Sequence, residues 1–179
     1  MSSNGIDRLK KEFDDLNSNP LINIGECQVI LPKKDNYFEW EFILKGPKDS
    51  SYADGLFLLK AVFPDDYPEG RPKVYFITPV YHCNVNPKKN EFENLGHVSL
   101  ETLSWWYPEY TLRKAITSIF DLFNNQNPDS PYSFEIAKEF RTNRDLFEEK
   151  VKYFIKKYAN EGNMVKEELN SDWDFSYNK

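Results

Sequence analysis

The chain has 179 residues and a formal net charge of −6 at pH 7, with 40% apolar and 16% aromatic residues. This is the size of one ordinary domain, with enough apolar content for a folded core. The acidic balance argues against nucleic acid as the main partner, and no apolar run is long enough to span a bilayer, so we expect no membrane partner either. No secretory signal is visible, and the two cysteines, Cys27 and Cys83, fit a reducing compartment; we therefore expect a cytoplasmic location, a nuclear one or both.

The pattern of elements predicts an α+β fold. Apolar residues at helical spacing from Ile6 to Leu16 predict an N-terminal helix that ends before Pro20. Four strand-like segments follow, and the short turns between them favour an antiparallel meander over βαβ units. The segments are 27–31, 37–45, 56–63 and 74–76. The third segment carries apolar residues on both of its faces, so we expect both faces to be covered.

The second half of the chain predicts a long loop and three helices. Residues 78–108 show no clean periodicity, which is typical of a functional loop. Helical spacing returns in three stretches that begin near residues 112, 134 and 147. The core domain is therefore expected to cover residues 1–159. Residues 160–179 form an acidic tail that we expect to be loosely ordered, with aromatics that either pack on the domain or serve as a docking peptide.

Seven short phrases stand in order along the chain. They are DNYFEW (35–40), KGPKDSSYADGLF (45–57), FPDDYP (63–68), YHCN (81–84), GHVSL (96–100), WYPEYTL (106–112) and NPDSP (127–131). Together they resemble the ubiquitin-conjugating enzyme family over roughly residues 6–158. The resemblance implies that family's fold and its carrier step, in which a cysteine receives the C-terminal glycine of ubiquitin or a ubiquitin-like protein as a thioester. The activating enzyme supplies the group, a lysine accepts it, usually with a ligase, and no cofactor is implied.

The resemblance also implies roles for individual positions. Ser99 occupies the place of the family's catalytic cysteine. His82 and Asn84 match residues that precede the loop, the histidine as a structural residue and the asparagine as support for the oxyanion or the loop. Asp129 and Ser130 fall where the family often has a polar or acidic gate, although turn formation is the simpler role for them here.

Serine in place of cysteine changes the expected chemistry. A free thiol with a pKa of about 8.5 is partly thiolate at neutral pH, whereas a serine hydroxyl needs an adjacent base to act as a nucleophile. His97, two residues before Ser99, is a candidate base, but a solvated loop histidine is the simpler interpretation. Cys83 is a weaker candidate for a substitute nucleophile, because a lone cysteine beside a turn usually packs as a small apolar residue. His82, Cys83 and His97 lack any recognised ligand spacing, so we expect no metal.

The surroundings of Ser99 depart from the family pattern in three ways. Cys83 stands where the family has a proline, and Arg71-Pro72 replaces a double proline. The polar segment 86–94 lengthens the interval before Ser99. These changes favour natural divergence over a single replaced residue.

Two loops that face ligases in the family carry acidic residues here. Glu69 lies near the position of a bulky apolar anchor, and Glu109 follows Tyr107 and Pro108 in the second contact loop. Acidic side chains at these positions are expected to weaken the usual apolar contact with a ligase.

Two functional hypotheses follow. In the first, the protein is a non-catalytic variant that binds ubiquitin, a ubiquitin-like protein, an activating enzyme, a ligase or an active conjugating enzyme, and modulates transfer. In the second, it is a genuine conjugating transferase whose cysteine was deliberately replaced by Ser99. The departures around Ser99 favour the first, while Asn84 and the C-terminal helices keep the second open. A scaffold unrelated to ubiquitin is the least favoured alternative.

Overall fold

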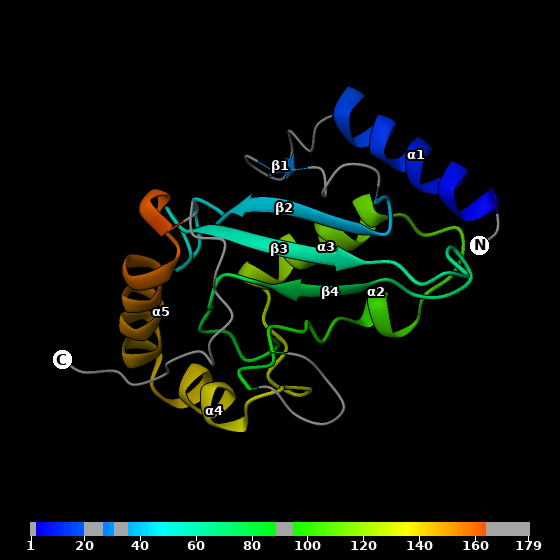
Figure 1. Ribbon diagram of the computed structural model, residues 1–179. Helices are drawn as coiled ribbons and strands as arrows, with labels where there is room; N and C mark the ends of the chain where they lie inside the picture. Colours follow the sequence, from blue (N-terminus) through cyan, green and yellow to red (C-terminus); the bar gives the residue numbers. More distant parts are fainter. Residues whose placement is uncertain (1–2, 20–26, 31–35, 89–94, 164–179) are drawn as a thin grey trace.

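The computed structural model describes residues 3–19, 27–30, 36–88 and 95–163. Its elements appear in the predicted order and confirm the α+β class (Figure 1). They are α1 (Ser3–Ser18), β1 (Cys27–Ile30), β2 (Glu39–Lys45), β3 (Leu56–Val62), β4 (Lys73–Phe76), α2 (Glu101–Ser104), α3 (Leu112–Asn124), α4 (Phe134–Thr142), α5 (Arg144–Tyr158) and the 3₁₀ turn η1 (Glu161–Asn163).

The four strands pair as an antiparallel meander in the order β1-β2-β3-β4, as predicted. Across β2, β3 and β4 one face of the sheet is fully buried, because residues that alternate along each strand point to the same side. Its buried side chains on β2, β3 and β4 are Trp40, Phe42, Leu44, Phe57, Leu59, Ala61, Val74 and Phe76. The expectation that β3 is covered on both faces is wrong: its other face is only half-buried, and Lys60 there forms an ion pair with Glu39 at 2.7 Å.

Helix α3 covers the buried face of the sheet and passes behind the strands in Figure 1. The ring of Phe123 on α3 lies 5.0 Å from that of Phe57 and 5.9 Å from that of Phe76. At the other end of the sheet, Phe13 of α1 packs edge-on against Trp40 at 5.8 Å. These aromatic contacts join both helices to one core.

The last three helices begin at residues that favour helix N-termini. The side chains of Thr111, Ser133 and Asn143 accept hydrogen bonds from backbone N–H groups three residues later, which satisfies donors that the helix leaves open. The segment 125–133 joins α3 to α4 and ends at the Ser133 cap. That segment borders the candidate site.

The long loop holds more regular structure than predicted, since it contains α2 and two isolated bridges, Tyr75↔His97 and Val85↔Val98. A helix of four residues is too short to produce a periodic pattern. The predicted loosely ordered tail has its first residues in η1, while residues 164–179 lie outside the described part of the chain. Within the described part, no helix is long and apolar enough to cross a membrane.

Candidate functional site

Ser99 is positioned by a short ladder between β4 and the segment that follows Asn84. On one side, Phe76 donates its N–H to the carbonyl of Gly96 at 2.8 Å, and Val98 donates to Val74 at 3.2 Å. On the other side, Ser99 donates its N–H to the carbonyl of Asn84 at 2.8 Å. The hydroxyl-bearing residue is therefore held by backbone hydrogen bonds, independently of its own side chain.

The polar segment that lengthens this interval leaves the ladder undisturbed. Asn86 donates its N–H to the carbonyl of His97 at 2.8 Å, and Gly96 donates to the carbonyl of Asn86 at 2.9 Å. Asn86 and Gly96 are therefore joined beside Ser99. These backbone bonds close the chain there, so a longer interval does not by itself displace Ser99 from its place against Asn84.

The Asn84 side chain is buried and fully engaged with the segment 125–133. Its Nδ2 donates to the carbonyls of Asn127 at 2.7 Å and Ser130 at 3.1 Å, and its Oδ1 accepts from the N–H of Asn127 at 2.8 Å. An asparagine amide has two donor hydrogens. Both are used on the loop, so in this arrangement Asn84 supports the loop and holds no donor ready for an oxyanion.

His82 is buried, and its contacts identify its tautomer. The N–H of Asn84 donates to Nδ1 at 3.0 Å, so Nε2 carries the proton and donates to the carbonyl of Leu122 at 3.0 Å. Burial lowers the pKa of His82 to about 4, and the ring is neutral at physiological pH. Both ring nitrogens of His82 are therefore engaged in hydrogen bonds with the backbone.

Cys83 is fully buried between His82 and Asn84. Burial raises the pKa of its thiol to about 11, and Sγ donates to Oδ1 of Asn84 at 3.4 Å. Its carbonyl accepts from the N–H of Tyr132 at 2.7 Å. A buried, protonated thiol is a poor nucleophile. The geometry therefore gives no support to Cys83 as a substitute for the missing cysteine.

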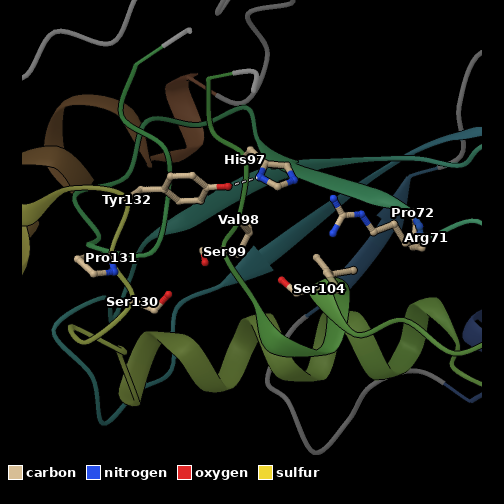
Figure 2. Close-up of a pocket in the computed structure, with 10 residues that line it drawn as sticks. Arg71, Pro72, His97, Val98, Ser99, Ser104, Ser130, Pro131 and Tyr132 are labelled. Atoms are coloured by element: carbon tan, nitrogen blue, oxygen red, sulfur yellow. Dashed lines mark hydrogen bonds between the residues drawn. The ribbon is translucent and has the colours of Figure 1, made fainter. Parts of the chain in front are cut away.

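Ser99 opens into a cavity of about 310 Å³ (Figure 2). The cavity lies between the ladder, α2, the turn before β4 and the segment 125–133. Its lining residues are Arg71, Pro72, His97, Val98, Ser99, Leu103, Ser104, Ser130, Pro131 and Tyr132. Ser99 is half-buried, and its hydroxyl forms no hydrogen bond with any described residue. The described residues thus include no base in contact with this hydroxyl.

His97, the candidate base, is turned toward Tyr132. Its Nδ1 shares a hydrogen bond of 2.6 Å with the Tyr132 hydroxyl, drawn as the dashed line in Figure 2, and its ring lies 5.5 Å from that of Tyr75. Tyr132 was not among the residues singled out from the sequence. A hydrogen bond between residues 35 positions apart has no local signature.

The two gate residues are separated by the structure. Ser130 lines the cavity, whereas Asp129 is exposed and forms an ion pair with Arg141 of α4. Asp129 also donates its N–H to Oδ1 of Asn127 at 3.0 Å, which is the turn-forming role that its position suggested. In the part of the chain that the structure describes, no group of three or more His, Cys, Asp or Glu side chains is placed to hold a metal ion.

The two loops that carry the predicted ligase-facing residues lie side by side. Trp106 donates its indole N–H to the carbonyl of Pro68 at 2.8 Å, which brings Glu69 into the neighbourhood of the second loop. Glu69 and Glu109 are exposed, Pro108 is half-buried, and Tyr107 is 54% exposed. The two adjacent tryptophans face different ways: Trp105 is 69% exposed, while Trp106 packs against Tyr67.

The domain is an α+β domain in which α3 covers an antiparallel meander. A cavity lies at the end of the ladder, beside the loop that Asn84 anchors. The family model described as ubiquitin-conjugating enzyme matches residues 8–155. The chain belongs to the ubiquitin-conjugating enzyme family. A similar solved structure is that of a candidate ubiquitin-conjugating enzyme from Plasmodium yoelii, which shares 32% identity, covers 89% of this chain and 98% of its own, and superposes with a TM-score of 0.76.

Proposed function

We propose that this protein is a non-catalytic member of the family, which binds ubiquitin or a ubiquitin-like protein and modulates its transfer without carrying it. The family interacts with such modifiers in general. The observation that carries the proposal is the Ser99 hydroxyl, which stands at the nucleophile position without a hydrogen-bonded base among the described residues. Further candidate partners are an activating enzyme, a ligase and an active conjugating enzyme, and the proposed location is the cytoplasm, the nucleus or both.

The chemistry at Ser99 supports binding over transfer. A serine hydroxyl attacks a thioester only when a base removes its proton, and any oxyester that formed would be a poorer acyl donor than a thioester. His97 is directed toward Tyr132 and Tyr75. The buried thiol of Cys83 offers no second route, because its pKa is raised to about 11.

A second candidate function is a genuine conjugating enzyme whose cysteine is replaced by Ser99. The observation in its favour is the order that surrounds this residue: the ladder, the His82 contacts and the Asn84 hydrogen bonds are all formed. Contacts of this kind around the nucleophile position are expected of a catalytic site that has been retained.

A charging assay with activating enzyme, ATP and ubiquitin tests the proposal. We expect no adduct that a reductant cleaves, because the described site holds no reactive thiol. An adduct that resists reductant but is cleaved by hydroxide would mean that Ser99 accepts the acyl group, and would contradict the proposal. A reductant-sensitive adduct would also contradict it and would point to a cysteine.

The Ser99→Cys variant separates the two candidates. Efficient charging followed by discharge to lysine would support a disarmed transferase with intact machinery. Failure to charge, in a variant whose circular dichroism matches the parent, would support natural loss of catalysis. The codon at position 99 in the native gene is an independent check, since a cysteine codon there would favour the second candidate.

A further inference from the structure

The cavity beside Ser99 is positively charged, although the chain as a whole is acidic. Arg71 is the one residue in its lining with a permanent charge, and the lining includes no Asp or Glu. Figure 2 shows Arg71 reaching toward the cavity from the side opposite Pro131 and Tyr132. The guanidinium forms no ion pair or hydrogen bond with any described residue, so its five donors remain available for a ligand.

Neutral donors complete the lining. The hydroxyls of Ser99, Ser104 and Ser130 all border the cavity, and none forms a hydrogen bond with another described residue. They come from the ladder, from α2 and from the segment 125–133 respectively, so they approach the cavity from different sides. A permanent cation combined with several hydroxyl donors matches a small anion that has more than one acceptor oxygen.

The nearest acidic residue in sequence does not cancel this charge. Asp129 directly precedes Ser130, but its carboxylate is exposed and paired with Arg141 on α4. The guanidinium of Arg141 therefore compensates Asp129 outside the cavity. The positive potential of Arg71 faces the cavity without an opposing carboxylate from its lining.

We propose that this cavity binds a free carboxylate, and that its ligand is the C-terminal glycine carboxylate of the modifier. This inference rests on the proposed function. An acyl group carried as a thioester is uncharged and needs no cation, whereas the same glycine in free ubiquitin ends in a carboxylate. A guanidinium donates two parallel N–H bonds to the two oxygens of a carboxylate in a planar fork. Arg71 stands where the family pattern has a proline, so the cation at this cavity is a feature of this chain.

The experiment uses the full chain and a peptide that carries only the terminal group. N-acetyl-Gly-Gly is titrated as the free acid and as the C-terminal amide, and amide resonances of residues 97–99 and 104 are followed by NMR. We expect saturable shifts with the acid and at least about tenfold weaker binding of the amide, because the amide lacks the charge. Inorganic phosphate is titrated in parallel as a competing anion.

Arg71→Gln and Lys73→Gln form a matched pair. Both residues are exposed and both changes remove one positive charge, but Lys73 does not line the cavity. We expect Arg71→Gln to weaken binding of the acid at least about tenfold and Lys73→Gln to leave it within about twofold. Equal binding of acid and amide, retained binding in Arg71→Gln, or no shifts at the cavity would each overturn the proposal. Tighter binding of phosphate than of the peptide acid would also overturn it, as it would assign the site to a phosphoryl group.

Intact ubiquitin and ubiquitin whose C-terminal carboxylate is converted to an amide separate this inference from the proposed function. Equal binding of the two forms would leave the proposed function standing and overturn the carboxylate site as the place where the modifier binds. If the peptide acid binds and neither ubiquitin form does, the carboxylate site stands, and the proposed function fails for ubiquitin. Loss of binding on amidation, together with loss in Arg71→Gln, supports both.

Discussion

Asn84 and Ser130 are joined by a 3.1 Å hydrogen bond from the asparagine Nδ2 to the serine carbonyl. This bond, together with the two between Asn84 and Asn127, ties the turn before the ladder to the loop that borders the cavity. Because Ser99 itself hydrogen-bonds to the backbone of Asn84, one residue sets the spacing between the two walls of the site. Asn84 is therefore a positioning residue.

We expect Asn84→Ala to destabilise the protein by about 2–4 kcal/mol, because it leaves buried backbone groups of the loop without partners. The measurement is urea unfolding, combined with hydrogen exchange at Tyr132, whose N–H donates to Cys83 beside this network. Asn124→Ala is the control, since Asn124 is exposed and its side chain makes no hydrogen bond with a described residue. Similar losses in the two variants would contradict the role assigned to Asn84.

The buried His82 makes stability depend on pH. Its pKa falls from 6.5 in the unfolded chain to about 4 in the folded protein, so the unfolded state binds more protons between these values. The contribution of neutral His82 to the free energy of unfolding is therefore fully present above pH 6.5 and is lost as the pH falls toward 4. The loss amounts to at most about 3 kcal/mol.

The check is the free energy of unfolding between pH 7 and 4, with His82→Gln and His97→Gln compared with the parent. His82→Gln should flatten the acid-side loss, while His97→Gln should retain the part due to His82. Since the chain has two histidines, the His97→Gln protein also assigns the remaining imidazole signal to His82 in NMR spectra. A His82 signal that titrates near pH 6.5 in the folded protein would contradict the burial argument.

Gly96 is required by the ladder that carries Ser99. Its φ is +79°, a conformation that L side chains rarely adopt, and a Cβ atom there would overlap the carbonyl oxygen of Phe76. We expect Gly96→Ala to cost about 2–4 kcal/mol and to shift the amide resonance of Ser99. Gly162→Ala is the matched control, because a Cβ there would meet only the side-chain oxygen of Asn160, at 3.3 Å. Equal stability of the two variants would show that the ladder tolerates a side chain.

Local patterns account for most of the fold. Trp40, Phe42 and Leu44 alternate along β2, and the turn at Asp54-Gly55 returns the chain directly into β3, so the meander could be predicted. The burial of only one face of β3 could not, because it depends on which side the helices cover. The four residues of α2 were missed because they span a single turn.

The site could be predicted in part. The phrases around Asn84 and Ser99 place both residues at the same region of the domain, and the structure brings them into backbone contact. The bonds of Asn84 to residues 43 and 46 positions away, and that of His97 to Tyr132, depend on tertiary packing and leave no mark in the local pattern. Arg71 was noted only as a departure from a double proline, since nothing in the sequence shows that it faces Ser99's cavity.

Helix α1 is held to the core by a buried carboxylate. Glu12 accepts from the Tyr67 hydroxyl at 2.6 Å, from the Leu112 N–H at 2.7 Å and from Nε of Arg8 at 2.6 Å. We expect Glu12→Gln to destabilise the protein by about 1.5–3 kcal/mol, because an amide cannot accept all three bonds. Asp14→Asn removes a charge from an exposed position on the same helix and should change stability by less than about 0.5 kcal/mol. Thermal and urea unfolding of the two variants measure the difference, and equal effects would contradict the anchoring role.

The buried thiol of Cys83 predicts slow alkylation. With a pKa raised to about 11 and no exposed surface, it is almost entirely protonated and shielded at neutral pH. We expect iodoacetamide to modify Cys83 in the folded protein at least about a hundredfold more slowly than the cysteine of Ser99→Cys, measured by peptide mapping of each site. Unfolding in urea should remove the difference, which controls for the reactivity of the peptides themselves. Rapid modification of Cys83 in the folded parent would make it an accessible nucleophile beside the cavity, and the proposal of a non-catalytic protein would then lose its argument against a substitute nucleophile.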